Sequence, residues 1–225
     1  MEKTDWEKLI DTLVRQGTLR TPSVIKAMLI VPRTKFLAPD SQEYSATDTP
    51  LLIGHGQTIS APHIVATMNE NLQLQTGQKI LEIGAGSGWH AATLAETVAP
   101  THWSRNEWGH VYTIENNPAL ADIARKNIMN TGYGDRVSII VADGSKGYPG
   151  KAPYDRVVVA AAAPEIPRPL VEQLKSGGIM LIPVGSASLF QTLLKVTKEN
   201  DGNLKEESLG NVTFVPLTGE YGYKF

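Results

Sequence analysis

The stretch KILEIGAGSGWHAATL, residues 79–94, constrains the fold of this chain more than any other part of it. Its apolar first part carries an acidic residue, Glu82, and continues into three alternating glycines, Gly84, Gly86 and Gly88. A helical pattern follows, so the stretch predicts a strand, a tight loop and a helix. Glycine lets the backbone turn sharply and approach a ligand, and the start of the helix offers unpaired N–H groups. We expect a ligand-binding loop here, with a plain βα turn as the alternative.

The spacing of these glycines distinguishes two classes of nucleotide-binding loop. In the dinucleotide fingerprint GxGxxG, two residues separate the second glycine from the third. Here a single residue, Ser87, separates them, which argues against a nicotinamide dehydrogenase. The pattern ExGxGxG instead resembles the first motif of methyltransferases that depend on S-adenosylmethionine.

Composition excludes several classes of site and partner. The 225 residues include 21 basic and 23 acidic side chains, which is not the basic excess of a dedicated DNA- or RNA-binding protein. The absence of cysteine excludes disulfides, thiolate metal sites and cysteine nucleophiles. The five histidines show no HxxxH or HExxH spacing, so we expect no metal site.

The N-terminal residues MEKTDWEKLI carry charges where a signal peptide needs an apolar core. No run of the sequence approaches the ~18 apolar residues that a membrane helix needs. We therefore expect a cytoplasmic protein without a membrane partner.

From residue 79 onward, strand patterns alternate with helix patterns. Repeated βα units of this kind indicate an α/β fold with a doubly wound, mostly parallel sheet, Rossmann-like in character. Strands are expected at residues 79–83, 110–114, 137–141, 155–160 and 179–184. Helices are expected at residues 117–130 and 167–175, the second ending at Gly177-Gly178.

The two ends of the chain differ from this core. Two helices are expected near the N-terminus, at residues 5–16 and 21–31. Two strand-like runs, 190–198 and 204–215, flank the turn sequence Asn200-Asp201-Gly202-Asn203 and predict a β-hairpin. We expect one domain with three parts: N-terminal helices and a substrate segment (1–78), a cofactor-binding core (79–185), and a C-terminal hairpin and tail (186–225).

Acidic residues follow the predicted strands where a ligand would lie, since ligands of open α/β sheets bind beyond the carboxyl ends of the strands. Glu115 closes the second strand and is suited to accept both ribose hydroxyls of a nucleoside, or it is a solvated residue before the next helix. Asp143-Gly144 closes the third strand and could take the adenine side, although Asp-Gly is also a common turn. The long interval before Glu115 contains residues 99–109, a packed surface loop or, less simply, a lid built on its tryptophans.

Ser60 has two compatible interpretations. Apolar residues at helical spacing follow it, and Pro62 stands in the first turn, so Ser60 is placed to be a helix N-cap. A hydroxyl at a helix N-terminus also lies in a field that favours an anion.

Taken together, these motifs resemble the protein-L-isoaspartate (D-aspartate) O-methyltransferases, a repair family. The resemblance covers about residues 20–219, and its distinguishing element is GQTISAP at residues 56–62. The other matching segments are LEIGAGSGWHAATLA (81–95), VYTIE (111–115), the run from 143 to 185, and FVPLTGEYG (214–222).

The resemblance assigns roles to individual residues. Ser60 matches the active-site serine of the family, and Thr218 lies near the tail position that approaches the site. The cofactor-binding residues that we expect are Gln57, Thr58, Ile59, Glu82, Gly84, Gly86, Gly88, Glu115, Asn116, Asp143, Gly144 and Thr218. The cofactor implied is S-adenosylmethionine, with S-adenosylhomocysteine as product.

The implied substrate is the free α-carboxylate of isoaspartyl residues in damaged proteins and peptides. Such a carboxylate has an ordinary pKa near 3.3 to 3.7, so it is ionised at pH 7 and needs no general base. Ser60 is then expected to position the carboxylate by a hydrogen bond. The resemblance further implies that the methyl ester goes on to a succinimide without enzyme help and so returns gradually to aspartate. We expect a monomer; activity on D-aspartyl sites is left open.

The sequence departs from the family's pattern at two places and leaves three alternative functions open. Residues 99–109 look like an insertion, and Ala160 stands where threonine is common. A methyltransferase for nucleic acid or a small metabolite is the first alternative, but AAAAP at residues 160–164 replaces the [DN]PP[YFW] of adenine amino-methylating enzymes. A regulatory module that binds a nucleoside without catalysis is the second, and the dehydrogenase is the weakest.

Overall fold

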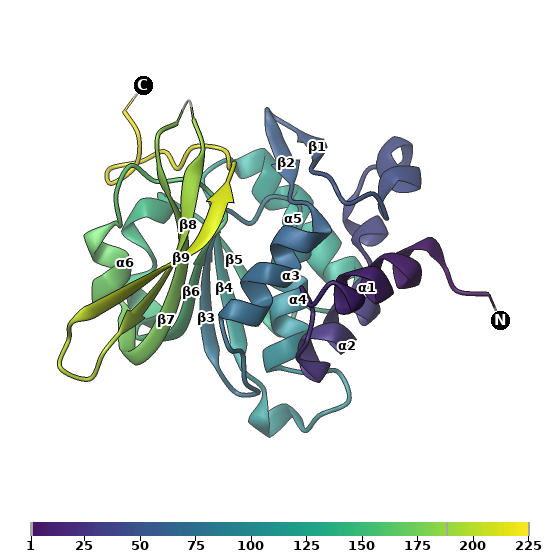
Figure 1. The fold of residues 1–225 in the computed structure, drawn as a ribbon, viewed down its shortest axis with the longest axis horizontal. Helices are drawn as coiled ribbons and strands as arrows, with labels where there is room; N and C mark the ends of the chain where they lie inside the picture. Colours follow the sequence, from purple (N-terminus) through teal and green to yellow (C-terminus); the bar gives the residue numbers. More distant parts are fainter. Residues whose placement is uncertain (1, 188, 225) are drawn as a thin grey trace.

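The fold is built on one seven-stranded sheet (Figure 1), in a computed structural model that describes residues 2–187 and 189–224. The strands are β1 (Leu51–Gly54), β2 (Gln57–Ile59), β3 (Lys79–Ile83), β4 (His110–Glu115), β5 (Val137–Val141), β6 (Tyr154–Val159), β7 (Leu174–Gly185), β8 (Gln191–Lys198) and β9 (Leu204–Val212). The helices are α1 (Asp5–Arg15), α2 (Pro22–Ile30), α3 (Pro62–Asn71), α4 (Trp89–Val98), α5 (Pro118–Asn130) and α6 (Arg168–Glu172). Short 3₁₀ turns are η1 (Arg33–Phe36), η2 (Pro39–Tyr44), η3 (Arg105–Glu107), η4 (Gly144–Lys146) and η5 (Pro149–Lys151).

The sheet has the order β5-β4-β3-β6-β7-β8-β9. Strands β3 to β7 run parallel, and β8 and β9 continue the same sheet as an antiparallel hairpin. The expected doubly wound sheet and C-terminal hairpin are therefore confirmed. The chain winds outward from β3 through β4 to β5 and then returns to β6 on the other side of β3. The strand order reverses at β3 and β6, which is where ligands of such sheets bind.

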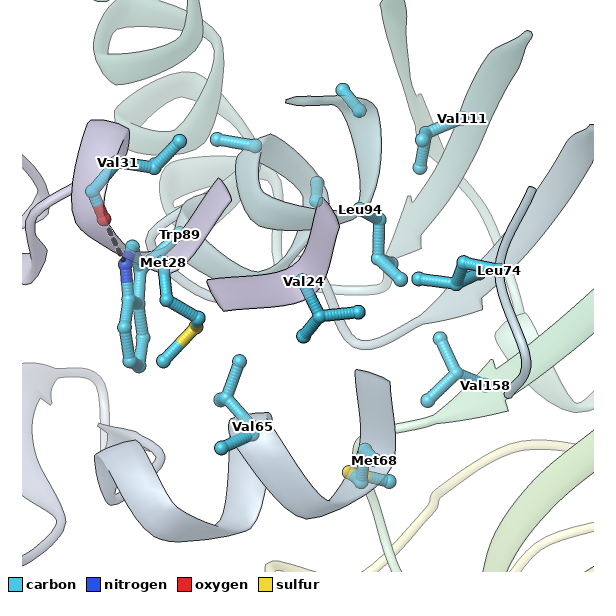
Figure 2. Close-up of a cluster of buried hydrophobic side chains, with 14 of the residues drawn as sticks. Val24, Met28, Val31, Val65, Met68, Leu74, Trp89, Leu94, Val111 and Val158 are labelled. Carbon is cyan, nitrogen blue, oxygen red and sulfur yellow. Dashed lines mark hydrogen bonds between the residues drawn. The ribbon is translucent and has the colours of Figure 1, made fainter. Parts of the chain in front are cut away.

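Helices cover both faces of the sheet, because parallel strands are buried on both sides. Figure 1 shows α3, α4 and α5 on one side of the sheet and α6 on the other. Figure 2 shows how the first of these faces is filled: Met28, Val65, Leu94 and Val158 come from α2, α3, α4 and β6 and point into one apolar cluster. The indole of Trp89 lies at the edge of this cluster and donates to the carbonyl of Val31 at 3.0 Å.

The helical prediction for residues 167–175 is wrong at its C-terminal end. Helix α6 ends at Glu172, and β7 begins at Leu174, which pairs with Tyr154 of β6. Gly177 has φ +73° and lies in an irregular part of β7, where the register with β6 shifts. The two glycines thus mark a bulge that lets β7 start early, not the end of a helix.

Residues 33–59 form an ordered segment, as expected, but they also contain a hairpin that was not predicted. Strands β1 and β2 pair antiparallel around Gly54, His55 and Gly56, all three with positive φ. Figure 1 shows this hairpin and the C-terminal segment at the same end of the sheet. Both therefore flank the carboxyl ends of the parallel strands.

The loop at residues 99–109 lies at the opposite end. It connects the end of α4 to the start of β4, where His110 pairs with Lys79, the first residue of β3. Trp108 donates its indole N–H to the carbonyl of Pro100 at 3.0 Å, so the loop closes on itself. A packed surface loop is the correct interpretation, since a lid over the glycine loop would have to lie at the other end of the sheet. Among the helices of residues 2–187 and 189–224, none is long and apolar enough to cross a membrane.

Candidate functional site

A cavity of about 970 Å³, including its open mouth, lies at the carboxyl ends of β3, β4 and β6. Predicted site residues that line it are Gln57, Thr58, Ile59, Ser60, Gly84, Gly86, Glu115, Asn116, Gly144 and Thr218. The fold thus brings together residues from five separate parts of the sequence.

The glycine loop forms one wall of the cavity because its backbone takes conformations that other residues avoid. Gly84 has φ +95° and donates its N–H to the carbonyl of Ile114 at 2.8 Å. Gly86 has φ +52° and donates to the Glu115 carboxylate at 3.0 Å. Gly88 lies behind the wall: a Cβ there would come within 3.2 Å of Ile128 on α5. Position 88 therefore needs glycine so that α4 can pack against α5. Gly88 does not line the cavity, where it was expected to contact a cofactor.

Glu115 is held rigidly at the end of β4. One carboxylate oxygen accepts from Gly86, and the other accepts from the N–H of Asn117 at 3.1 Å. Each carboxylate oxygen can accept more than one hydrogen bond, so both keep a free lone pair. Because Glu115 lines the cavity, a pair of neighbouring hydroxyls could bind to it without any rearrangement.

Asp143 and Gly144, both predicted to lie on the adenine side of the cofactor, differ in where their side of the backbone faces: only Gly144 lines the cavity. Gly144 lines the cavity, and a Cβ there would lie only 2.5 Å from a methyl carbon of Ile83. The Asp143 carboxylate instead accepts from Ser145 and from the N–H of Glu220 at 2.9 Å, which lowers its pKa. Burial opposes this lowering. Asp143 is thus turned to the C-terminal segment and does not line the cavity.

The C-terminal segment closes the cavity opposite the glycine loop. Leu217 donates to the carbonyl of Ala162 at 2.6 Å, so the segment runs beside the end of β6. Thr218 accepts a hydrogen bond of 2.7 Å from the Asn116 side chain. This contact joins two predicted cofactor residues that are far apart in the sequence.

Ser60 is not a helix cap, and that part of the prediction is wrong. Helix α3 begins at Pro62, so Ala61 occupies the N-cap position and makes no side-chain cap. The Asp48 carboxylate takes over this task, because it accepts from the N–H of His63 at 2.9 Å. Within the described part of the chain, the Ser60 hydroxyl has no hydrogen-bond partner and is available to a ligand.

A second cavity lies beside the first, and Ser60 separates them. Its lining includes His63 and Ile64 of α3 and Phe214 of the C-terminal segment. Residues that line both cavities are Thr58, Ser60, Ala160 and Val215. The serine therefore stands at the junction of a polar, glycine-rich cavity and a more apolar one.

Glu82 lies beneath the first cavity and not in its lining. The carboxyl is fully buried, and it accepts from the Thr113 hydroxyl at 2.6 Å. Its other oxygen, Oε1, has no hydrogen-bond partner but lies 3.3 Å from His90 Nδ1. The direct cofactor contact expected of Glu82 is not formed by the fold, because β3 turns this side chain inward, under α4.

His90 and Glu82 share a buried polar network that favours neutral groups. His90 Nε2 faces the Asn69 side-chain oxygen at 3.0 Å, so this nitrogen carries a proton. Burial lowers the pKa of His90 to about 4 and raises the pKa of Glu82 to about 8. With Nε2 protonated and the ring neutral, Nδ1 is an acceptor that faces a protonated Glu82. His90 also lines the cavity, which makes this network part of its floor.

Sequence reasoning missed several residues at the site. Ser87 and Trp89, within the glycine motif, both line the cavity, and the Ser87 hydroxyl is buried without a partner. Arg33 and Asp48 lie in the segment that we treated as irregular, and no local pattern marks them. Their contacts depend on residues that are distant in the sequence. No group of three or more His, Asp or Glu side chains that could hold a metal occurs in residues 2–187 and 189–224.

Comparisons with known proteins point to one family. The family model of the protein-L-isoaspartate(D-aspartate) O-methyltransferases matches residues 4–222. A protein-L-isoaspartate O-methyltransferase of Hyperthermus butylicus is 54% identical over 217 residues, covering 96% of this chain and 90% of that protein. One of Thermococcus onnurineus is 49% identical over 226 residues, covering 100% of this chain and 99% of that protein.

A solved structure is also similar over nearly the whole chain. It is a Plasmodium falciparum protein described as a protein-L-isoaspartate O-methyltransferase, crystallised in complex with S-adenosyl-L-homocysteine. The TM-score is 0.84 at 27% sequence identity, and the match covers 96% of this chain and 99% of the other.

Proposed function

Because this chain belongs to the protein-L-isoaspartate(D-aspartate) O-methyltransferase family, we propose that it methylates the free α-carboxylate of isoaspartyl residues in damaged proteins and peptides. S-adenosylmethionine supplies the methyl group on an electrophilic sulfonium centre, and S-adenosylhomocysteine is the product. The observation that carries the proposal is the position of Ser60, at the junction of a polar, glycine-rich cavity and a second, more apolar one.

The first cavity suits this cofactor. Glu115 keeps two free lone pairs for the ribose hydroxyls, and Gly144, which packs closely against Ile83, lines the same cavity. The Ser87 hydroxyl is buried in the wall without a partner, so a polar ligand group would satisfy it. Gly84 and Gly86 let the backbone come close to the ligand. We assign the remaining lining residues Gln57, Thr58, Ile59, Asn116 and Thr218 to the same cavity.

Ser60 acts as a positioning hydrogen-bond donor in this proposal. The isoaspartyl carboxylate is ionised at pH 7 and already nucleophilic, so the protein has no proton to remove. His63 is bound to Asp48 at 2.9 Å and not to Ser60, which argues against a serine nucleophile activated by histidine. The main contribution of the site is then to align the carboxylate oxygen with the methyl group, an effect that can supply roughly 7 to 11 kcal/mol.

The second cavity suits the peptide around the damaged residue. Ile64 and Phe214 give it an apolar lining, and it opens to the surface beside the C-terminal segment. A methyltransferase of small polar metabolites would have no use for such an opening. We therefore favour a protein or peptide substrate over the metabolite alternative.

The test compares two peptides that differ only in one aspartyl linkage, normal or iso. Labelled methyl should pass from S-adenosylmethionine to the isoaspartyl peptide alone. Ser60→Ala should lower kcat/KM about tenfold to a hundredfold, the effect of losing one hydrogen bond to a charged group. Ser138→Ala, whose hydroxyl contacts His110 in the sheet, is the matched control and should leave kcat/KM unchanged.

Two outcomes would contradict the proposal. Equal methylation of both peptides would remove the isoaspartyl specificity. Binding of S-adenosylhomocysteine without any transfer would instead favour the regulatory module. The expectations of a monomer, of a cytoplasmic location and of no nucleic-acid partner remain predictions, which light scattering, cell fractionation and gel-shift assays would check.

A further inference from the structure

We propose that Arg33 is a positioning residue for methyl transfer, which holds the segment that bears Ser60 against the start of α4. This inference rests on the function proposed above. Arg33 is the first residue of η1 and is fully buried. It touches neither cavity, so it would act through the residues it binds.

The Arg33 guanidinium binds three backbone carbonyls from two chain segments. One nitrogen donates to Thr47 at 3.1 Å, and the other donates to Thr49 at 2.8 Å and to Ile59 at 3.0 Å. Ile59 is the last residue of β2 and directly precedes Ser60. The planar guanidinium has donors in a fixed fork, so it sets the distance between these segments.

The same guanidinium contacts the cofactor side of the site. It lies over the Trp89 ring, 5.6 Å from the ring centre, and Trp89 lines the first cavity. The Trp89 indole in turn donates to the carbonyl of Val31, two residues before Arg33 (Figure 2). Trp89 is therefore fixed to the short segment 31–33 by a hydrogen bond and by the cation–π contact with Arg33.

A further connection runs to the second cavity. Asp48 lies between the two threonines that Arg33 binds, and its carboxylate accepts from both the backbone N–H and the Nδ1 of His63. His63 lines the second cavity. A single buried side chain thus joins the serine segment, the first residue of α4 and the turn that orients a wall of the substrate cavity.

Arg33 is not placed there by an ion pair. In the part of the chain that the structure describes, no carboxylate lies within ion-pair distance of it; Asp48 acts on it only through space. Its Nε has no hydrogen-bond partner. Burying a charge with carbonyl partners alone is costly. If only packing were needed, an apolar side chain could fill this space at a lower free-energy cost. We therefore assign the guanidinium group a role in aligning the segment that bears Ser60 with the start of α4.

The test uses Arg33→Lys, which keeps the charge but loses the fork, and Arg33→Ala with added guanidinium ion. Arg156→Lys is the matched control, because Arg156 also donates to three backbone carbonyls, those of Leu72, Gln73 and Asp155, away from both cavities. Measurements are kcat and KM with the isoaspartyl peptide, the dissociation constant of S-adenosylhomocysteine, and amide hydrogen exchange of residues 57–60, all well below the melting midpoint of each variant.

For Arg33→Lys we expect kcat/KM to fall about tenfold to a hundredfold, as a small misplacement of reacting groups does. Exchange at residues 57–60 should become faster, while the dissociation constant changes less than about threefold. Millimolar guanidinium, but not methylammonium, should restore part of the activity of Arg33→Ala. Arg156→Lys should lower only the melting midpoint.

The inference is overturned if the Arg33 variants lose only stability, as the control does, or if exchange at residues 57–60 is unchanged. The proposed function fails in a different way, namely if the wild-type chain methylates neither peptide. Hydrogen exchange then still decides whether Arg33 holds the serine segment.

Discussion

Arg33 and Arg136 are both buried guanidinium groups that lie over a tryptophan, but they differ in how their charge is balanced. Arg136 stands at the amino end of the sheet, 4.7 Å from the centre of the Trp108 ring, and binds the carbonyl of Ala99 at 2.7 Å. It also lies 3.4 Å from the Glu96 carboxylate, which is itself buried. Arg33, near the carboxyl ends of the strands, has carbonyl partners and no carboxylate within ion-pair distance.

At the amino end of the sheet, where buried charge affects only folding, the charge is neutralised by an opposite charge. Beside the site, buried polar groups are left without a full set of hydrogen-bond partners. The buried side-chain atoms without a hydrogen bond are Arg33 Nε, Glu82 Oε1, Ser87 Oγ and Arg136 Nε, within residues 2–187 and 189–224. Three of them lie in or near the cofactor cavity: Ser87 lines it, Glu82 lies beneath it, and Arg33 contacts Trp89 in its lining. The fourth, Arg136 Nε, still has Asp135 at 3.4 Å.

The largest expected effect is on the free energy of unfolding and concerns Glu82, a buried carboxyl group beneath the cofactor cavity. Its pKa is raised to about 8 by burial, so the native state binds a proton that the unfolded chain releases near pH 4.5. Stability should therefore be lost as the pH rises from about 4.5 to about 8, by roughly 5 kcal/mol in total. Glu82→Gln mimics the protonated acid and should remove this loss, which denaturant unfolding at several pH values would measure.

His90 provides the internal check on that experiment. Burial lowers its pKa to about 4, so the native state favours the neutral ring. The stability that this neutral ring contributes is lost as the pH falls from about 6.5 towards about 4, the opposite direction to the loss from Glu82. That acid-side loss should persist in Glu82→Gln. If wild type and variant instead lose stability in parallel up to pH 8, Glu82 is not held protonated.

The next effect concerns Arg136, whose buried charge is paired with a carboxylate. Arg136→Met leaves the Glu96 carboxylate buried without its cation, so we expect a loss of about 3 kcal/mol in the free energy of unfolding. Three other donors to Glu96, two from Thr101 and one from Tyr133, keep the loss near the lower end of the usual range. Below its melting midpoint the variant should keep wild-type kcat and KM.

Adding Glu96→Gln to Arg136→Met should restore part of the lost stability, because it removes the unpaired charge. Denaturant unfolding of the single and double variants measures both effects. A drop in kcat comparable to that of the Arg33 variants would erase the distinction between the two arginines.

The smallest effect concerns the contact between Asn116 and Thr218. Asn116→Ala removes one exposed hydrogen bond of 2.7 Å across the cofactor cavity, worth about 0.5 to 1 kcal/mol. The dissociation constant of S-adenosylhomocysteine should rise about threefold by calorimetry, with kcat unchanged. This is the reverse of the change expected for Arg33. Thr218→Val combined with Asn116→Ala should add nothing further, and an additive result would show that the two side chains act separately.

The βα core was predictable from sequence because local patterns determine it. The alternation of apolar runs with helical spacing, and the glycines after Lys79, predict the parallel strands and the position of the cavity. The tail hairpin was predictable for the same reason, since Asn200-Asp201-Gly202-Asn203 is a turn sequence. Helix 167–175 failed because strand pairing with β6 outweighed the local helical pattern.

What could not be predicted depends on contacts between distant segments. Asp48 occupies the capping role that local spacing gave to Ser60, because the N–H of His63 lies next to it only in the folded chain. Arg33 was missed because its partners are 14, 16 and 26 residues away. Glu82 and Gly88 belong to a motif whose pattern does not say which members face the ligand and which face the core.

The segment around Thr218 has a consequence for how the protein is made. Val215, Pro216 and Thr218 form a wall of the cofactor cavity, and they are the last of its residues to be synthesised. On the ribosome, the cavity stays open until residue 218 has emerged and Pro216 and Leu217 have paired with Ala162. A product that is cut short before residue 215 lacks this wall, so its cavity is open on that side.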